Sequence, residues 1–132
     1  MDFISFDDLL FKHYIKFKYN VSGYCSYESP HHLFKIEDTI HYKSLIKSDY
    51  SDYEKLISTT KQKEHSKEDF LKLKNNFNIE TLKENKIKIL WNDKLKKYTI
   101  EDGCHRLSVI KFKNLDDNGN MPKEWFNIKG SK

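Results

Sequence analysis

The stretch Tyr98 to Ile110, YTIEDGCHRLSVI, decides the fold that we predict for this chain. A β-forming run comes first, the Asp102-Gly103 pair then predicts a turn, and the apolar pattern after it predicts a helix over 105–113. Upstream, the run KIKILW and the polar NDKLKK lead into the same strand, which is typical of a hairpin. The sequence therefore predicts a hairpin, a glycine turn and a helix start as one continuous unit.

His105 and Arg106 fall in the first turn of the predicted helix, where an anion site is expected. Helix N-termini present unpaired N–H groups with a partial positive charge, and Gly103 permits close approach of a phosphate. Arg106 can make bidentate contacts with phosphate oxygens, and it is the one Arg in a chain with 23 Lys. Asp102 can bind a metal, orient a hydroxyl or accept a proton. An ordinary turn followed by a helix is the alternative interpretation.

Capping patterns and apolar spacing predict the remaining elements. Each of three further helices is opened by a Ser with an acidic residue three positions later. These helices are expected over 5–18, 51–58 and 67–77, one or two strands with a turn over 33–46, and a last strand near 125–128. This order predicts an α+β fold with a small mixed sheet flanked by helices.

Length and composition favour one domain over 1–132. The 24 Lys and Arg residues exceed the 20 Asp and Glu residues by only four, so the charge favours neither a nucleic acid nor a membrane as partner. The apolar runs are shorter than the about 20 residues that span a membrane. The N-terminus carries early acidic residues and no small-residue cleavage site, so we expect a cytoplasmic protein. Cys25 and Cys104 give no disulfide framework.

The segment Ile100 to Arg106, IEDGCHR, resembles the I/V-x-DG-x-HR signature of the ParB/sulfiredoxin superfamily. The upstream pieces SKEDFLKLKNNF and IKILW stand in the order that the superfamily shows, and the resemblance covers about residues 60–115. It implies a ParB/sulfiredoxin-like core over 46–132. Residues 1–45 then form an N-terminal extension, which we expect to shape an acceptor pocket or a homodimer interface.

Free serine kinases of this superfamily carry a DG-x-HR motif, which Asp102, Gly103, His105 and Arg106 match. The resemblance implies that Asp102 activates a substrate hydroxyl and that His105 and Arg106 hold nucleotide phosphates. The expected function is therefore phosphate transfer from ATP or another nucleotide, with Mg²⁺, to a small hydroxylated molecule.

An upstream Glu also contributes to catalysis in those kinases. Glu64 lies in the comparable loop, KQKEHSKED, and Glu68 is the nearby alternative. No motif fixes the register of this loop, so a solvated loop carboxylate is the competing interpretation of Glu64.

Sulfiredoxins carry a GCHR sequence whose Cys attacks an ATP-activated sulfinic acid, and residues 103–106 match those four letters. The resemblance implies Cys104 as an alternative catalytic nucleophile and as a nucleotide contact. A thiol at a helix N-terminus beside His and Arg is expected to have a depressed pKa. The chain departs from sulfiredoxins at Asp102, where they have a second Gly.

Other functions have weaker support in the sequence. ParB proteins hydrolyse CTP but use arginine-rich boxes and a helix-turn-helix domain, so no specific DNA binding is expected here. A non-catalytic nucleotide- or partner-binding module remains an alternative. Cys25 and His41 with the His31-His32 pair lack the spacing of a zinc site. Six tyrosines are candidates for a small polar pocket, namely Tyr19, Tyr24, Tyr27, Tyr42, Tyr50 and Tyr53.

Overall fold

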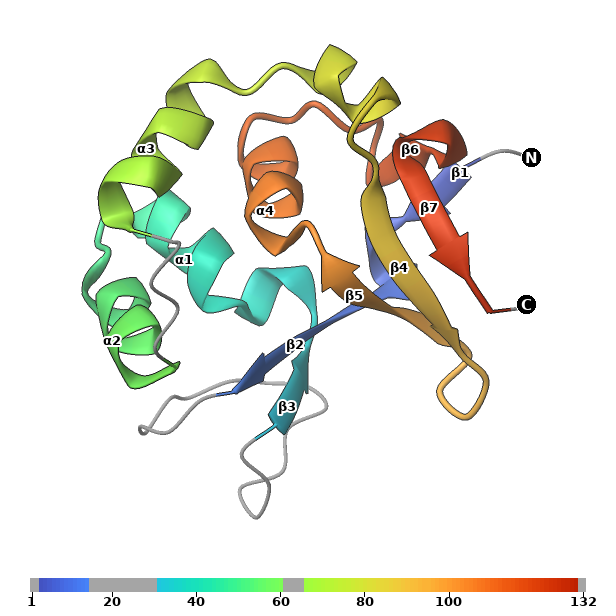
Figure 1. Cartoon of the computed structure of the whole chain (residues 1–132), viewed down its shortest axis with the longest axis horizontal. Coiled ribbons are helices and arrows are strands. Elements are labelled where there is room, and N and C mark those ends of the chain that lie inside the picture. Colours follow the sequence, from blue (N-terminus) through green and yellow to red (C-terminus); the bar gives the residue numbers. More distant parts are fainter. Residues whose placement is uncertain (1–2, 15–30, 61–65, 131–132) are drawn as a thin grey trace.

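The computed structural model describes residues 3–14, 31–60 and 66–130, which form an α+β fold with a mixed sheet. The helices gather on one side of the molecule and the longer strands on the other (Figure 1). The helices are α1 Ile40–Lys47, α2 Ser51–Thr60, α3 Lys67–Asn76 and α4 Cys104–Phe112. The strands are β1 Phe3–Ser5, β2 Leu9–Tyr14, β3 His31–Phe34, β4 Ile87–Asn92, β5 Lys97–Asp102, β6 Asn120–Pro122 and β7 Phe126–Lys129. None of these helices has the length and apolar character needed to cross a membrane.

Within the described residues, the main sheet has five strands in the order β3-β2-β5-β4-β7. The pairs β2-β5 and β4-β7 are parallel, whereas β2-β3 and the β4-β5 hairpin are antiparallel. β1 and β6 form a separate antiparallel pair. The expected boundary between the N-terminal extension and the core lies between residues 45 and 46. Because β2 lies inside the main sheet, this sheet contains strands from both sides of that boundary.

The helix predicted over 5–18 is wrong, because this segment enters strand β2. The Ser5 cap exists, since its Oγ accepts a hydrogen bond from the Asp7 amide at 3.2 Å, but it begins a single 3-10 turn. Residues 9–11 are buried in succession. Consecutive buried residues are typical of a strand covered on both faces, whereas an amphipathic helix would expose some of them.

The strands predicted over 33–46 are correct only at the start, because β3 ends at Phe34 and residues 40–46 belong to α1. Thr39 is the N-cap of α1, and its Oγ1 accepts a hydrogen bond from the Tyr42 amide at 3.1 Å. The buried residues of α1 are Ile40, His41, Ser44 and Leu45. This spacing is helical, and with the Thr cap it was the signal for a helix.

The other predicted elements are confirmed, with small differences at their ends. Helices α2, α3 and α4 correspond to the helices expected over 51–58, 67–77 and 105–113. Strands β4 and β5 form the expected hairpin, and β7 is the expected last strand.

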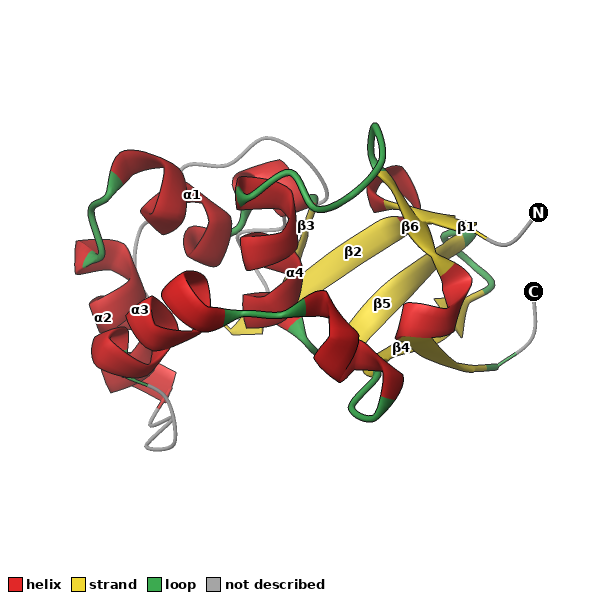
Figure 2. Cartoon of the chain, turned by 90° about the horizontal axis from the view of Figure 1, so that it is seen from above, coloured by secondary structure: helices red, strands yellow, loops and turns green. Residues whose placement is uncertain are grey.

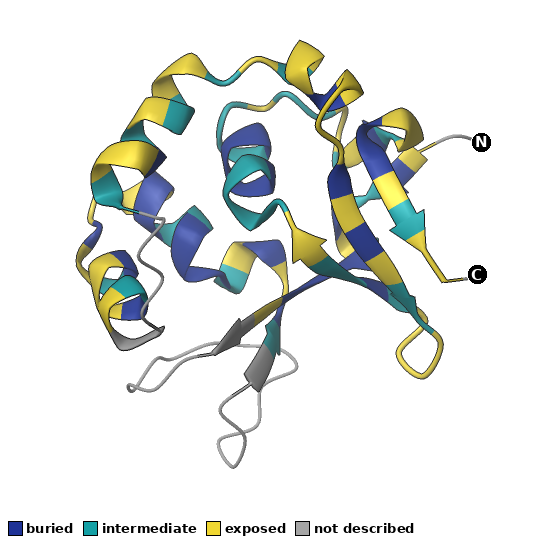
Figure 3. Ribbon diagram, viewed as in Figure 1, coloured by how far each residue is buried: buried dark blue, intermediate teal, exposed yellow. Residues whose placement is uncertain are grey.

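Helix α4 lies between two apolar clusters of the described core. Leu107 and Ile110 belong to the larger cluster on the sheet, and Val109 belongs to the smaller cluster among the helices. Figure 2 shows α4 between the sheet and the other helices. Figure 3 shows that the residues of α4 are buried or intermediate, whereas the outward faces of α2 and α3 are exposed. The turn before α4 is therefore fixed against both parts of the molecule.

Candidate functional site

The candidate site lies at residues 102–106, the motif turn, which joins β5 to α4. Gly103 has a φ of 125°, a conformation that residues with a side chain rarely adopt. A Cβ at this position would lie 2.8 Å from Cγ2 of Ile87. A larger residue would therefore be strained and would push the turn away from β4.

The motif turn ends in the N-terminus of α4. Leu107 donates the first backbone hydrogen bond of the helix to the carbonyl of Gly103, at 2.9 Å. Gly103 is the N-cap and has no side chain that could accept from the amides after it. The first amides of a helix are directed beyond its N-terminus and give it a partial positive charge. An anion beside this turn would therefore be stabilised.

Arg106 links the motif turn to the loop before β4. Its guanidinium donates from Nη1 to the carbonyl of Asn85 and from Nη2 to that of Lys86. Nη2 also lies 3.8 Å from Oδ2 of Asp102, and the Arg106 side chain is only 13% exposed. Burial lowers the pKa of Arg106, but a guanidinium keeps its charge at neutral pH. These two bonds use part of its five N–H donors, so it can hold the loop and still contact a ligand.

The motif turn forms one wall of a pocket of about 280 Å³. The residues on this wall are Asp102, Gly103, His105 and Arg106. The opposite wall, the helical wall, consists of Tyr53 from α2 and Asp69, Phe70 and Leu73 from α3. The structure thus brings together four of the sequence-predicted site residues and faces them with residues from two helices.

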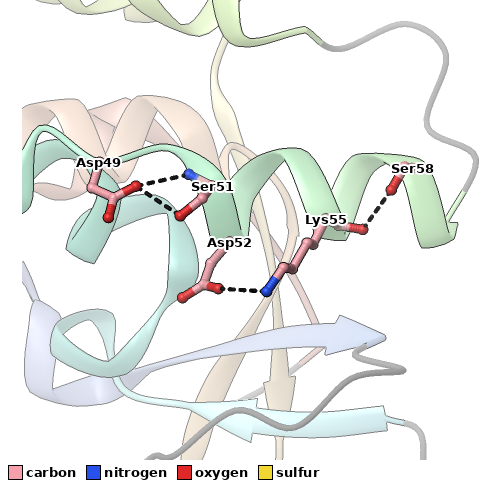
Figure 4. A network of polar contacts seen from close by, with 5 residues as sticks. All are labelled: Asp49, Ser51, Asp52, Lys55 and Ser58. Atoms are coloured by element: carbon pink, nitrogen blue, oxygen red, sulfur yellow. Dashed lines mark hydrogen bonds and ion pairs between the residues drawn. The ribbon is translucent and has the colours of Figure 1, made fainter.

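Helix α2 carries Tyr53, and a network of polar contacts fixes its start (Figure 4). Oδ1 of Asp49 accepts hydrogen bonds from the hydroxyl of Ser51 at 2.7 Å and from its amide at 3.1 Å. These bonds lower the pKa of the Asp49 carboxyl. Asp49 rather than Ser51 is therefore the acceptor at the helix start. Tyr53 faces inward and is 1% exposed.

Helix α3 supplies a carboxyl group and the apolar part of the helical wall. Oγ of Ser66 accepts a hydrogen bond from the Asp69 amide at 3.1 Å, which confirms the predicted cap. Phe70 is 2% exposed and meets the ring of His105 edge to face at 5.2 Å between centroids. The apolar spacing of the helix predicted over 67–77 is consistent with a buried Phe70 but gives no sign that this residue borders a pocket.

His105 is enclosed by aromatic rings from three helices. Its Nε2 lies 2.8 Å from the hydroxyl of Tyr53. The His41 ring lies 4.4 Å from it between centroids, at an interplanar angle of 85°. Burial is the main reason that the pKa of Tyr53 is raised, and Cys104 and Asp69 act in the same direction. The Tyr53 hydroxyl is therefore protonated at neutral pH.

Cys104 is not among the described residues that line the pocket, although it lies in the motif turn. Its side chain packs against the larger apolar cluster. Burial raises the pKa of Cys104 to about 12, and a hydrogen bond with Ser108 acts in the opposite direction. The raised pKa is opposite in direction to the predicted depressed pKa, because burial disfavours the charged thiolate. A protonated thiol is a poor nucleophile, which disfavours the sulfiredoxin-like alternative.

The sequence offered two candidates for an upstream carboxylate, Glu64 and Glu68. Glu64 lies outside the described residues. Glu68 is exposed on α3 and is not among the described pocket residues, whereas its neighbour Asp69 is. The Ser66 cap fixes the position of Asp69, so this residue could have been predicted at the start of α3.

The sequence analysis also considered a zinc cluster and a pocket lined by tyrosines. No group of three or more His, Cys, Asp or Glu in the described part of the chain could hold a metal ion. His41 packs against His105, while Cys25 and the side chains of the His31-His32 pair lie outside the description. Three of the six candidate tyrosines lie in the described part of the chain, and of these only Tyr53 lines the pocket. Tyr19, Tyr24 and Tyr27 lie outside the described residues. The described part of residues 1–45 contributes nothing to the lining.

Comparison of the chain with protein-family models, with curated proteins and with solved structures yields no match. The function must therefore be argued from the pocket itself.

Proposed function

We propose that this chain is a nucleotide-dependent phosphotransferase that acts on the hydroxyl of a small molecule. It would resemble the free serine kinases of the ParB/sulfiredoxin superfamily, with a core of that fold. The observation that carries the proposal is the meeting of Asp102, His105 and Arg106 around one pocket at the N-terminus of α4. A carboxylate, an imidazole and a guanidinium beside a helix N-terminus offer a base and several contacts for phosphate oxygens.

In the proposed reaction, the Asp102 carboxylate accepts the proton of the acceptor hydroxyl. The hydroxyl oxygen forms a bond to the γ-phosphorus of ATP, while the bond from that phosphorus to the β-phosphate oxygen breaks. ADP leaves with the electron pair of the broken bond. Arg106 and His105 contact the oxygens of the transferring group, where charge must be stabilised. The Asp102 side chain is 63% exposed, so an acceptor can reach it.

The size of the pocket supports a compact acceptor. A volume of about 280 Å³ is close to the lower limit, about 300 Å³, of pockets that enclose drug-sized ligands. It has room for the γ-phosphoryl group and a small acceptor but not for a whole nucleotide as well. The nucleoside would then extend beyond the rim of the pocket.

A Mg²⁺ ion that arrives with the nucleotide would find carboxyl groups on both walls of the pocket. Mg²⁺ is commonly held by one or two carboxylates together with substrate phosphates and water. Asp69 and Asp102 supply two carboxyl groups from opposite walls. When bound, the ion would neutralise charge on the phosphate oxygens.

The test is ³¹P NMR of the purified protein with ATP, Mg²⁺ and a pool of hydroxylated metabolites that includes serine and simple sugars. We expect a new phosphomonoester resonance. Asp102→Asn should slow its appearance by about 10²- to 10⁴-fold, because the variant removes the base. The exposure of Asp102 means that the change should leave the fold intact.

Asp93→Asn is the matched control. Asp93 is also an exposed Asp, and it lies in the turn at the other end of the hairpin, with Lys96 at 2.8 Å. This variant should transfer phosphate at the wild-type rate. Absence of any product with the wild type, or equal rates in wild type and Asp102→Asn, would overturn the proposal. A rise in melting temperature with ATP but no product would favour a non-catalytic nucleotide-binding module.

A further inference from the structure

The hydroxyl of Tyr53 is directed at a site residue that lies far away in the sequence. Tyr53 belongs to α2 and His105 to α4, yet the hydroxyl oxygen and Nε2 are 2.8 Å apart. Tyr53 is 1% exposed, and the contact is partly buried at the wall of the pocket. A hydrogen bond that is partly shielded from water fixes its partners more firmly than one in water does.

The rings around His105 hold this hydrogen bond in place. Phe70 packs against Tyr53 with the rings tilted and their centroids 4.8 Å apart, and it meets His105 edge to face. His41 is 3% exposed and covers another side of the imidazole. Rotation of the imidazole would therefore require these buried rings to move as well. The orientation of His105 depends on α1, α2 and α3, although its own motif lies on α4.

We propose that Tyr53 is a positioning residue whose hydroxyl donates to Nε2 of His105 and so keeps the neutral imidazole protonated at Nδ1. The reason is that a nitrogen that accepts a hydrogen bond carries no proton of its own. Tyr53 has a proton to donate, because burial keeps its phenol protonated. In the opposite arrangement, which the test below separates, Nε2–H would donate to the phenol oxygen. An imidazole protonated at Nδ1 is a hydrogen-bond donor at that atom, which is the character that a phosphate oxygen requires. The link to phosphate rests on the proposed function, whereas the tautomer does not.

The direct test is ¹⁵N NMR of histidine-labelled protein at about pH 8.5, where an ordinary imidazole is neutral. The variant His105→Gln identifies the His105 resonances. We expect Nε2 of His105 to be unprotonated and Nδ1 protonated in the wild type. In Tyr53→Phe, which keeps the ring and removes the hydroxyl, the population should shift by about fivefold or more toward the Nε2-protonated form.

Tyr50→Phe is the matched control. Tyr50 is also buried and directly precedes α2 in the chain, and its hydroxyl has no hydrogen-bond partner among the described residues. Loss of that hydroxyl should leave the His105 tautomer unchanged. A wild-type His105 protonated at Nε2, or a tautomer that Tyr53→Phe does not alter, would overturn the proposal whether or not the protein transfers phosphate.

Kinetics separate positioning from folding. If phosphate is transferred, Tyr53→Phe should lower kcat by about tenfold with little change in the KM of the acceptor, as expected for the loss of one hydrogen bond that orients a transition-state contact. Tyr50→Phe should keep both values. An altered tautomer with an unchanged kcat would show that the hydrogen bond does not serve the reaction and would overturn that part of the proposal.

Discussion

The two walls of the candidate pocket are held in place by different interactions. The motif turn is held by contacts with the segment at the start of β4: Gly103 lies directly against Ile87, and the Arg106 guanidinium donates to the carbonyls of Asn85 and Lys86. These contacts join the turn to the β4 edge of the hairpin. A short stretch of sequence and its own hairpin therefore define this wall.

The helical wall depends on side-chain packing between helices. Phe70 of α3 contacts the rings of His41, Tyr50, Tyr53 and His105, which come from α1, α4 and the α2 region. No turn or backbone bond of the motif supports this wall directly. The comparison teaches that the residues for chemistry can be encoded locally while their orientation depends on distant parts of the chain.

The largest expected effect comes from Phe70→Ala, which should break the helical wall. Removal of a buried Phe side chain costs about 3–5 kcal/mol of unfolding free energy, through lost burial and the cavity left behind. Phe70 is 2% exposed and contacts four other rings, so we expect the upper part of this range. Urea denaturation measures the loss.

Phe70→Leu is the control for this variant, because it keeps an apolar side chain in the wall. It should cost about 1–2 kcal/mol, in line with other large-to-smaller core changes. Equal small losses for both variants would mean that the helical wall does not rely on Phe70.

A smaller effect is expected from Gly103→Ala, which tests the motif turn. The new Cβ would meet Ile87 at 2.8 Å, and the φ of 125° adds strain. Together these should cost about 2–3 kcal/mol in unfolding free energy. Gly119→Ala is the control, because Gly119 also has a positive φ, 89°, but its Cβ would meet nothing within 4 Å. If both variants lose the same free energy of unfolding, then the contact with Ile87 of β4 is not what makes a side chain at position 103 destabilising.

The motif turn was predictable because its determinants lie within a few residues of one another. The strand, the glycine turn and the helix start all appear in YTIEDGCHRLSVI, and the structure places Asp102, His105 and Arg106 on one pocket wall. The hairpin before it was predictable for the same reason, since alternation and a polar turn are local signals.

Two segments were predicted incorrectly, and in the first of them tertiary burial overrides a local pattern. The Ser5 cap and the apolar spacing after it fit a helix, but the place of β2 between β3 and β5 requires an extended chain. The residues over 40–45 looked like a strand, but the cap at Thr39 and contact with α4 make them a helix. The extended form of β2 does not follow from a short window of sequence, whereas the Thr39 cap and the helical spacing after it were local signals for α1.

The helical wall could be predicted only in part. The spacing of α3 identifies Phe70 as buried, and the Ser66 cap fixes where Asp69 begins the helix. The contact between Tyr53 and His105 joins residues 52 positions apart, and no periodicity reports such a pair. Only the packing of α2 against α4 reveals it.

The smallest expected effect concerns Cys104, which lies in the motif turn but points into the core. Burial raises its pKa from an ordinary value of 9.0 to about 12. The folded protein therefore holds the thiol proton more tightly than the unfolded chain does. Stability from this group is fully present below pH 9 and is lost as the pH rises toward 12, by about 1 kcal/mol at pH 10. Urea denaturation at several pH values measures the slope.

Cys104→Ser separates this thiol from the other groups that titrate above pH 9. Tyr50 and Tyr53 also have raised pKa values, so their ionisation likewise lowers the free energy of unfolding as the pH rises. The wild type and Cys104→Ser both contain these tyrosines and share their contribution to the pH dependence. The difference between the wild type and Cys104→Ser then reports Cys104 alone, and it should be negligible at pH 7 and grow between pH 9 and 11. A difference of the opposite sign, with the wild type gaining stability relative to the variant as the pH rises, would mean that the folded state favours the thiolate. Cys104 would then share the anion-binding character of the pocket wall, and the redox alternative would regain its physical basis.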